Sequence, residues 1–204
     1  MKVQIDKTYP MPCSAEVAWG FLQNLEAVAV CMPGAKITER VGEGRYKGTV
    51  TVKVGPATMS FRGEVEMKDV DPAARTLRLL GKGTDSTGSS GASMDLTARI
   101  ESAEGNFCNL VGASEVSMNG KAATFGGRMM NTVADQILKQ FAGNFAGQVS
   151  ALQSQRASPV GMGGGAPAAP ASVPPRAAGE LNGLALLWSI LKDWLRGLLS
   201  RKTP

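Results

Sequence analysis

The sequence predicts an α+β domain in which a strongly curved antiparallel sheet has its apolar face covered by one long helix. Apolar residues alternate with polar ones in several short segments between residues 46 and 118, as expected of an antiparallel sheet with one solvated face. Two short helical patterns precede these segments, and a long stripe at helical spacing follows them. Without that last helix the apolar face of the sheet would stay exposed.

The chain begins with a strand and two short helices. Residues 2–9 alternate between polar and apolar types, and Pro10 and Pro12 are expected to end this strand. Ser14 is positioned to cap a helix that runs through residue 22. A second short helix is expected over residues 25–31, where Pro33 and Gly34 follow and require a tight exit.

Period-two alternation then marks the strands at about residues 46–54, 59–67, 77–79, 94–100 and 108–118. Turn-forming pairs separate them at residues 55–56, 71–72 and 104–105. A bent edge or mobile loop is expected near residues 81–91, where glycine and serine are frequent. The carboxylates Glu64 and Glu66 alternate with Val65 and are expected to face solvent.

One long helix is expected from about residue 122 to residue 149 and closes the domain, which spans residues 1–150. Its apolar positions recur at helical spacing and are Phe125, Met129, Met130, Val133, Ile137, Leu138, Phe141 and Phe145. The adjacent Gly126 and Gly127 are expected to let this helix approach the sheet closely.

Residues 151–180 are predicted to form a flexible linker. The stretch is rich in proline, alanine and glycine and contains a GMGGG run, with almost no side chain large enough to form a core. Thirty residues of this kind reach roughly 30 Å as a coil and up to about 90 Å in the polyproline form.

Residues 181–204 are predicted to form an amphipathic helix that lies on a membrane. Leucine and tryptophan fall mainly on one face, while Lys192, Asp193 and Arg196 argue against a transmembrane span. This segment carries a net charge of +3, which suits anionic lipid. The alternative is packing against the domain or a partner protein, for which a thirty-residue linker would be unnecessary. The predicted membrane-binding residues are Leu184, Leu187, Trp188, Leu191, Trp194, Leu195, Arg196, Leu198, Arg201 and Lys202.

Composition excludes several classes of function. The chain has no histidine, the commonest general base and transition-metal ligand. The cysteines at positions 13, 31 and 108 form no CxxC pair, so reduced thiols are expected rather than a disulfide or a metal site. Residues 1–150 carry a net charge of only +1 and residues 151–204 one of +4, so no basic nucleic-acid surface is expected on the domain. No phosphate-binding glycine motif is present, and the N-terminus is unlike a signal peptide, which predicts a protein of the cytoplasm.

Three stretches carry a resemblance to a known family. They are AWGFLQNLEAVAVCMPGA, MSFRGEVEMKDVDPA and GKAATFGGRMMNTVADQILKQFAGNF. They resemble the G-subunit family of aerobic carbon monoxide dehydrogenase, within the helix-grip (START-like, SRPBCC) superfamily. The tail is similar in kind, as a Pro/Ala/Gly linker before an apolar helix, but not residue by residue.

The resemblance implies a helix-grip fold whose sheet and long helix do not close completely, so that inward residues line an apolar cavity. Methionine suits such a lining because it is flexible and polarizable, although ordinary core packing is the alternative for any single Met. The candidate ligand-binding residues are Val52, Met59, Phe61, Met67, Leu79, Met94, Leu96, Met118, Phe125, Met129, Met130 and Val133.

The resemblance also implies a partner and a cargo. The partner is a molybdenum-containing carbon monoxide dehydrogenase, which this protein would recruit to the cytoplasmic face of the cell membrane. The expected ligand is a respiratory quinone, menaquinone or ubiquinone, which accepts the enzyme's electrons and whose head could be held by Ser114, Asn109 or backbone amides. The alternatives are a lipid carrier, an assembly factor and a helix-grip enzyme such as a cyclase or hydratase. The almost wholly apolar inward positions argue for a non-enzymatic protein.

Overall fold

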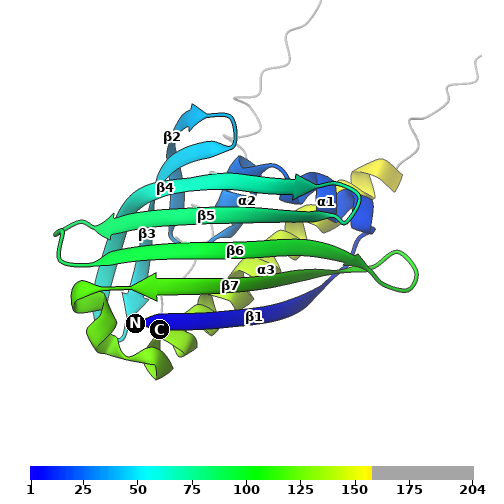
Figure 1. Ribbon diagram of the computed structural model, residues 1–204. Helices are drawn as coiled ribbons and strands as arrows, with labels where there is room; N and C mark the ends of the chain where they lie inside the picture. Colours follow the sequence, from blue (N-terminus) through cyan, green and yellow to red (C-terminus); the bar gives the residue numbers. More distant parts are fainter. Residues whose placement is uncertain (158–204) are drawn as a thin grey trace, which may run out of the picture. The chain divides into compact units, whose positions relative to one another are not determined.

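A computed structural model describes residues 1–157, which form a seven-stranded antiparallel sheet, three α-helices and one 3-10 helix (Figure 1). The strands lie in the order β1-β7-β6-β5-β4-β3-β2, so all neighbours except β1 and β7 are also consecutive in the chain. The elements are β1 (Lys2–Met11), α1 (Ala15–Leu22), α2 (Leu25–Cys31), β2 (Ala35–Gly42), β3 (Arg45–Val54), β4 (Ala57–Asp71), β5 (Thr76–Asp85), β6 (Gly91–Ser102), β7 (Cys108–Met118), η1 (Gly120–Phe125) and α3 (Gly127–Ala157).

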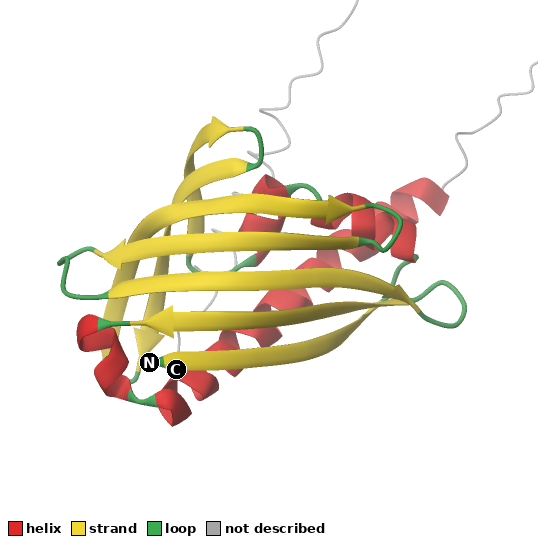
Figure 2. Ribbon diagram, in the orientation of Figure 1, coloured by secondary structure: helices red, strands yellow, loops and turns green. Residues whose placement is uncertain are grey.

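The sheet curves around α3, which lies across its concave face (Figure 2). Helix α3 contacts β1 and β3 as well as α1 and α2, which themselves contact the sheet at β2, β6 and β7. This arrangement is the helix-grip fold, as the sequence predicts.

The two short helices begin where the sequence predicts them. The Ser14 hydroxyl accepts a hydrogen bond from the Val17 amide at 3.4 Å and caps α1. The Asn24 side chain accepts one from the Ala27 amide at 3.1 Å and caps α2. After α2 the chain turns at Gly34, where φ is +75° and a Cβ would collide with the backbone of β3, so that glycine is required there.

Three glycines produce the sharp bend of the sheet. Gly48, Gly63 and Gly83 are direct cross-strand partners in β3, β4 and β5. A Cβ on Gly63 would collide with the Lys82 carbonyl oxygen, and one on Gly48 would lie 2.6 Å from the Lys36 carbonyl oxygen. The backbones therefore approach more closely than any other residue type allows, and the sheet turns here around α3.

The C-terminal part of the domain differs from the single helix expected over residues 122–149. A 3-10 helix ends at Phe125, Gly126 adopts a φ of +77°, and α3 starts only at Gly127. A Cβ on Gly126 or Gly127 would meet nothing within 4 Å, so close approach to the sheet is not their role. Instead the positive φ of Gly126 separates the two helices.

Two boundaries also differ from expectation. β1 continues to Met11 and includes Pro10, which is tolerated because β1 is an edge strand and needs no further hydrogen-bond donor there. Helix α3 continues to Ala157, so the first seven residues of the expected linker are helical. The rest of that linker and the predicted amphipathic helix lie outside the described residues.

The core consists of two separate clusters. The larger one contains twenty buried residues from α1, α2, the C-terminal half of α3 and the adjoining strand ends, with Phe145 fully buried and stacked edge-on against Phe21 at 5.0 Å. The smaller one contains only Val3, Val54 and Met130 as buried members. The two ends of the space between sheet and helix are therefore closed very unequally.

Candidate ligand-binding groove

The concave face of the sheet is apolar along almost its whole length. Strand pairing places alternate residues of every strand on this face, where Val3, Leu77, Ile100 and Leu110 are buried. Between the two core clusters the inward residues are only half-buried, and they include Ile5, Val65, Gly81, Met94, Leu96, Gly112, Ser114 and Val116. The facing residues of α3 are half-buried as well, namely Val133, Ile137, Leu138 and Phe141.

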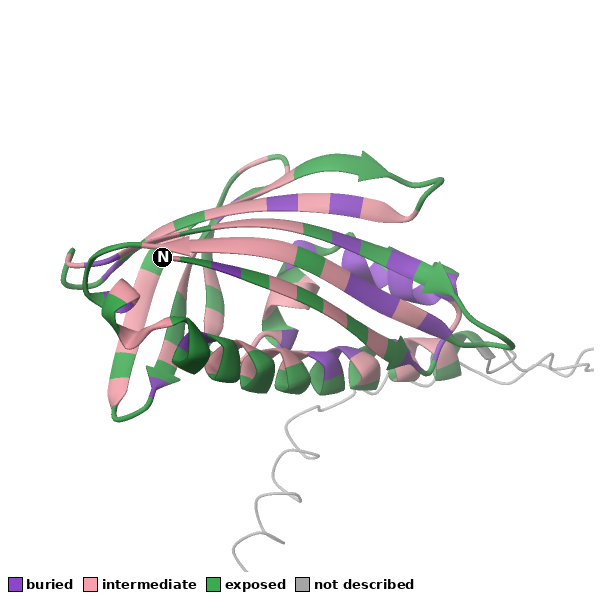
Figure 3. Ribbon diagram, turned by 60° about the horizontal axis from the view of Figure 1, so that its bottom comes forward, coloured by how far each residue is buried: buried purple, intermediate pink, exposed green. Residues whose placement is uncertain are grey.

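We call this partly covered apolar surface between the sheet and α3 the groove. In Figure 3 the purple, buried positions are most frequent toward the α1 end, whereas pink, half-buried positions extend along the strands away from it. The outward side of α3 is mostly exposed in the same view. Gly81 and Gly112 also face the groove, and the side chains of Met94 and Leu96 lie beside them.

The structure brings the predicted ligand-binding residues to this face. All of those on strands point to the concave side by register. Leu79 and Met130 are buried, and Met129 is 40% exposed at the start of α3. The remaining predicted residues are half-buried. All of them pack against one of the two core clusters, except Met59 and Phe61.

One ion pair lies at the seam between the sheet and α3. The Lys7 ammonium is 2.9 Å from the Asp135 carboxylate, and it shares the inward face of β1 with Ile5 and Tyr9. The hydrogen bond to Asp135 raises the pKa of Lys7, which therefore remains a hydrogen-bond donor at neutral pH. Lys7 is absent from the site residues predicted from sequence, although the alternation of residues 2–9 places it on the apolar side.

Ser114 is the second polar group of the groove. It faces inward between Ile5 and Leu96, its partners on β1 and β6. Its hydroxyl has no hydrogen-bond partner among residues 1–157. Asn109, the other expected polar residue, has the opposite parity on β7 and points away from the groove.

The glycine-rich segment near residues 81–91 consists of the end of β5, the start of β6 and the tight turn that joins them. β5 continues to Asp85, which is buried. Its carboxylate accepts hydrogen bonds from the amide of Ser90 at 2.6 Å and of Thr87 at 3.2 Å. A hydrogen bond from the Thr87 side chain is the main cause that lowers the pKa of Asp85, so the turn is built around a carboxylate.

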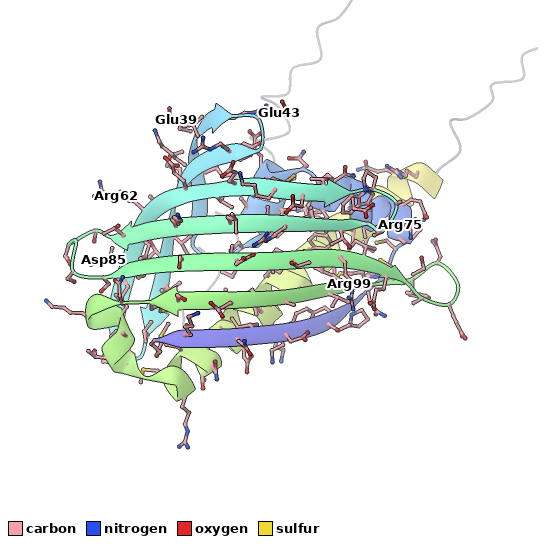
Figure 4. All side chains as sticks on the ribbon, in the orientation of Figure 1. Glu39, Glu43, Arg62, Arg75, Asp85 and Arg99 are labelled. Atoms are coloured by element: carbon pink, nitrogen blue, oxygen red, sulfur yellow. The ribbon has the colours of Figure 1, made fainter. Side chains whose placement is uncertain are left out.

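The convex face is polar and carries several ion pairs. They include Lys2–Glu115, Arg45–Glu64 and Arg78–Asp95, and the partly exposed Glu64 and Glu66 face solvent as expected. Figure 4 shows the charged side chains over this face, with Arg75 and Arg99 near α1 and Asp85 at the other end. A shallow depression of about 630 Å³ near the β5–β6 turn is lined by charged residues such as Arg62 and Lys82 together with Met1 and Met118.

The three cysteines are free and buried, as expected. The sulfur atoms of Cys13 and Cys108 lie 4.0 Å apart in the larger core cluster. Among residues 1–157, no group of three or more His, Cys, Asp or Glu side chains could hold a metal ion. In the same part of the chain, no helix is both long and apolar enough to cross a membrane.

Comparison with known proteins supports the fold and identifies a family. The family described as the G subunit of carbon monoxide dehydrogenase (CoxG) matches residues 10–150. No curated protein matches the chain.

Solved structures share the fold at low sequence identity. A conserved protein from Geobacillus kaustophilus has a TM-score of 0.66 and 18% identity, over 74% of this chain and 96% of that one. An aromatase/cyclase from Streptomyces sp. R1128 has a TM-score of 0.54 and 16% identity, over 79% and 99%. A norcoclaurine synthase from Thalictrum flavum has a TM-score of 0.53 and 14% identity, over 74% and 96%. At these identities the likeness concerns the fold alone.

Proposed function

Because the chain belongs to the CoxG family of carbon monoxide dehydrogenase G subunits, we propose that it is a non-enzymatic accessory protein that recruits a molybdenum-containing dehydrogenase to the membrane and carries a respiratory quinone for it. The observation that carries this proposal is the groove, an apolar surface left half-buried between two separate core clusters. Apolar residues left half-buried between two core clusters could accommodate a hydrophobic ligand.

A quinone matches the chemistry of the groove. Its isoprenoid tail needs an apolar lining, which the half-buried methionines and leucines supply. Its head offers two carbonyl oxygens as acceptors, and Lys7 and Ser114 are donors two positions apart along the inward face. The reduction by two electrons and two protons yields the quinol, which the same donors can still contact.

The membrane part of the proposal rests on residues 181–204. Their leucine and tryptophan face and their net charge of +3 predict attachment to the cytoplasmic surface of the cell membrane. A quinone lies in the bilayer, whereas a soluble dehydrogenase needs its acceptor outside it. A carrier anchored beside the bilayer connects the two.

The competing function is catalysis inside the groove, a possibility raised by the enzymes among the structural neighbours. Lys7 and Asp135 are the ionisable pair that such a reaction would use. The raised pKa of Lys7 leaves it protonated, so it is a donor rather than a general base. We therefore favour binding, and other apolar cargo such as a fatty acid is the remaining alternative.

The test starts from full-length protein purified from its own host. Organic extraction followed by mass spectrometry should find menaquinone or ubiquinone bound to it. Quinone-loaded protein should then be reduced by the dehydrogenase in the absence of membranes. A groove that holds only fatty acid, or electron transfer that is equally fast without this protein, would contradict the carrier role.

Membrane attachment is tested with a variant of the full-length chain in which Leu191 and Trp194 are replaced with Glu. Two charges in the predicted apolar face should greatly reduce sedimentation with anionic vesicles while quinone binding remains. Unchanged sedimentation would show that the tail is not the anchor.

A further inference from the structure

Positive charge gathers at the end of the domain that is formed by the β3–β4 turn, η1 and the start of α3. Lys53, Lys121 and Arg128 are exposed there, and we call this surface the basic end. The chain segments meet because Gly55 lies beside Met129, where a Cβ would be 3.8 Å from the methionine Cε.

The segments of the basic end are themselves free of acidic residues, although η1 packs on the turn built around Asp85, where the Ala122 amide donates a hydrogen bond to the Ser90 hydroxyl. No Asp or Glu occurs in residues 44–63 or 116–134, the segments that build it. None of Lys53, Lys121 and Arg128 forms an ion pair within the described part of the chain, whereas most charges of the convex face are paired. These three cations therefore share one end of the domain, whereas other described cations without an ion pair, such as Lys36 and Lys139, lie elsewhere on it.

The same end is where the groove is least closed. Only the smaller core cluster lies behind it, with three buried residues against twenty at the opposite end. Val50 and Met129 are each 40% exposed beside it, although Val50 points to the concave side. Exposed apolar groups surrounded by cations are characteristic of surfaces that contact lipid headgroups and the acyl boundary.

We propose that the basic end docks on a bilayer surface that carries anionic lipid, so that the least closed end of the groove faces the lipid. Charge complementarity carries the choice of partner, because each cation near an anionic leaflet strengthens binding by about fivefold. The docking is a contact of the folded domain itself and adds to the attachment predicted for residues 181–204. The role of this docking rests on the proposed function, because a lipid-soluble ligand would then pass from the bilayer into the groove without crossing water.

The experiment uses the full-length protein and places a fluorescent reporter at the basic end of the folded domain or, as a control, at its opposite end. The substitution Thr58→Cys, at an exposed position beside Lys53, can be labelled with a nitrobenzoxadiazole dye because the three native cysteines are buried. The control label is on Ala103→Cys, at an exposed position in the β6–β7 turn at the opposite end. Vesicles of phosphatidylcholine with and without phosphatidylglycerol are then added.

We expect dye fluorescence to rise at position 58 on vesicles containing phosphatidylglycerol and to stay unchanged at position 103. Changing Lys53, Lys121 and Arg128 to Glu should abolish the rise, while the protein still sediments through its tail. Changing Arg99, Lys139 and Arg156 to Glu alters the net charge equally and should leave the rise intact.

Equal signals at positions 58 and 103, or a rise that survives reversal of the basic end, would overturn the docking. A third outcome would also overturn the docking: the vesicles give no response, but the variant with Glu at the three basic positions no longer accepts electrons from the dehydrogenase. The basic end would then bind an acidic protein surface. Quinone content is measured in parallel on the same variants. Loss of docking with normal quinone content would leave the carrier function standing, whereas absence of quinone from every variant would contradict the carrier function alone.

Discussion

Lys7 and Asp135 join the edge strand β1 to helix α3 through a 2.9 Å ion pair at the border of the groove. Both side chains are partly exposed, at 40% and 58%, so the pair contributes little to folding stability. Its position suggests a role in holding the polar end of a ligand. The same strand carries a matched pair on the opposite face, where Lys2 is 2.8 Å from Glu115.

The first prediction compares these two pairs. Lys7→Met should lower the quinone content of the purified protein several-fold, because a donor to the quinone carbonyl is lost. Lys2→Met should leave quinone content unchanged, since Lys2 points away from the groove. Both variants should unfold close to the wild-type denaturant concentration. Equal quinone content in both variants would remove Lys7 from the site.

The second prediction fills the groove. Gly81→Leu places a bulky side chain on the concave face, where a Cβ meets Met94 only at ordinary contact distance, 3.5 Å. We expect binding of quinone and of an apolar fluorescent probe to fall at least several-fold. Lys82→Leu introduces the same side chain on the convex face and should bind normally. Normal binding by the Gly81 variant would mean that the ligand lies elsewhere.

The third prediction concerns the bend of the sheet. Gly63→Ala should destabilise the domain by about 2–3 kcal/mol, because its Cβ would collide with a backbone carbonyl that cannot yield easily. Gly81→Ala, on the neighbouring strand, should be neutral or stabilising by up to about 1 kcal/mol. Urea unfolding of both variants measures the difference. A Gly63 variant as stable as the wild type would show that the bend does not depend on this contact.

The fourth prediction concerns alkaline pH. Burial, with a smaller contribution from Cys13, raises the pKa of Cys108 from 9.0 to about 12. The unfolded chain releases this proton at lower pH than the folded one, so stability is complete below about pH 9 and declines as the pH rises toward 12. Unfolding in urea on either side of pH 9 should show the decline, and Cys108→Ala should reduce it. An identical pH profile for the variant would assign the effect to other groups.

The fold could be predicted from sequence because its signals are local. Alternating residues such as Val52 and Val54 show which face of a strand is turned inward. Ser14 marks the start of a helix, and the amide that it caps is only three residues away. The break at Gly126 was missed because the apolar spacing of Phe125 and Met129 is compatible with one continuous helix. Only the backbone conformation distinguishes the two cases.

The site was predictable only in part, for a different physical reason. The apolar lining follows from strand parity, which also identifies Lys7 once its strand is placed. The partner of Lys7 lies 128 positions away on α3, and no local pattern connects them. The cations of the basic end come from three separate segments, so their proximity exists only in the folded chain.

The unequal division of the core has a consequence for local unfolding of the domain. Amides around Phe145 and Leu77, inside a cluster of twenty buried residues, should exchange with solvent only when the whole domain unfolds. Amides around Val54 and Met130 are held by a cluster of three and should exchange through local opening. Local opening at that end is how a large ligand would enter under the proposed function, while the larger cluster keeps the rest of the domain folded.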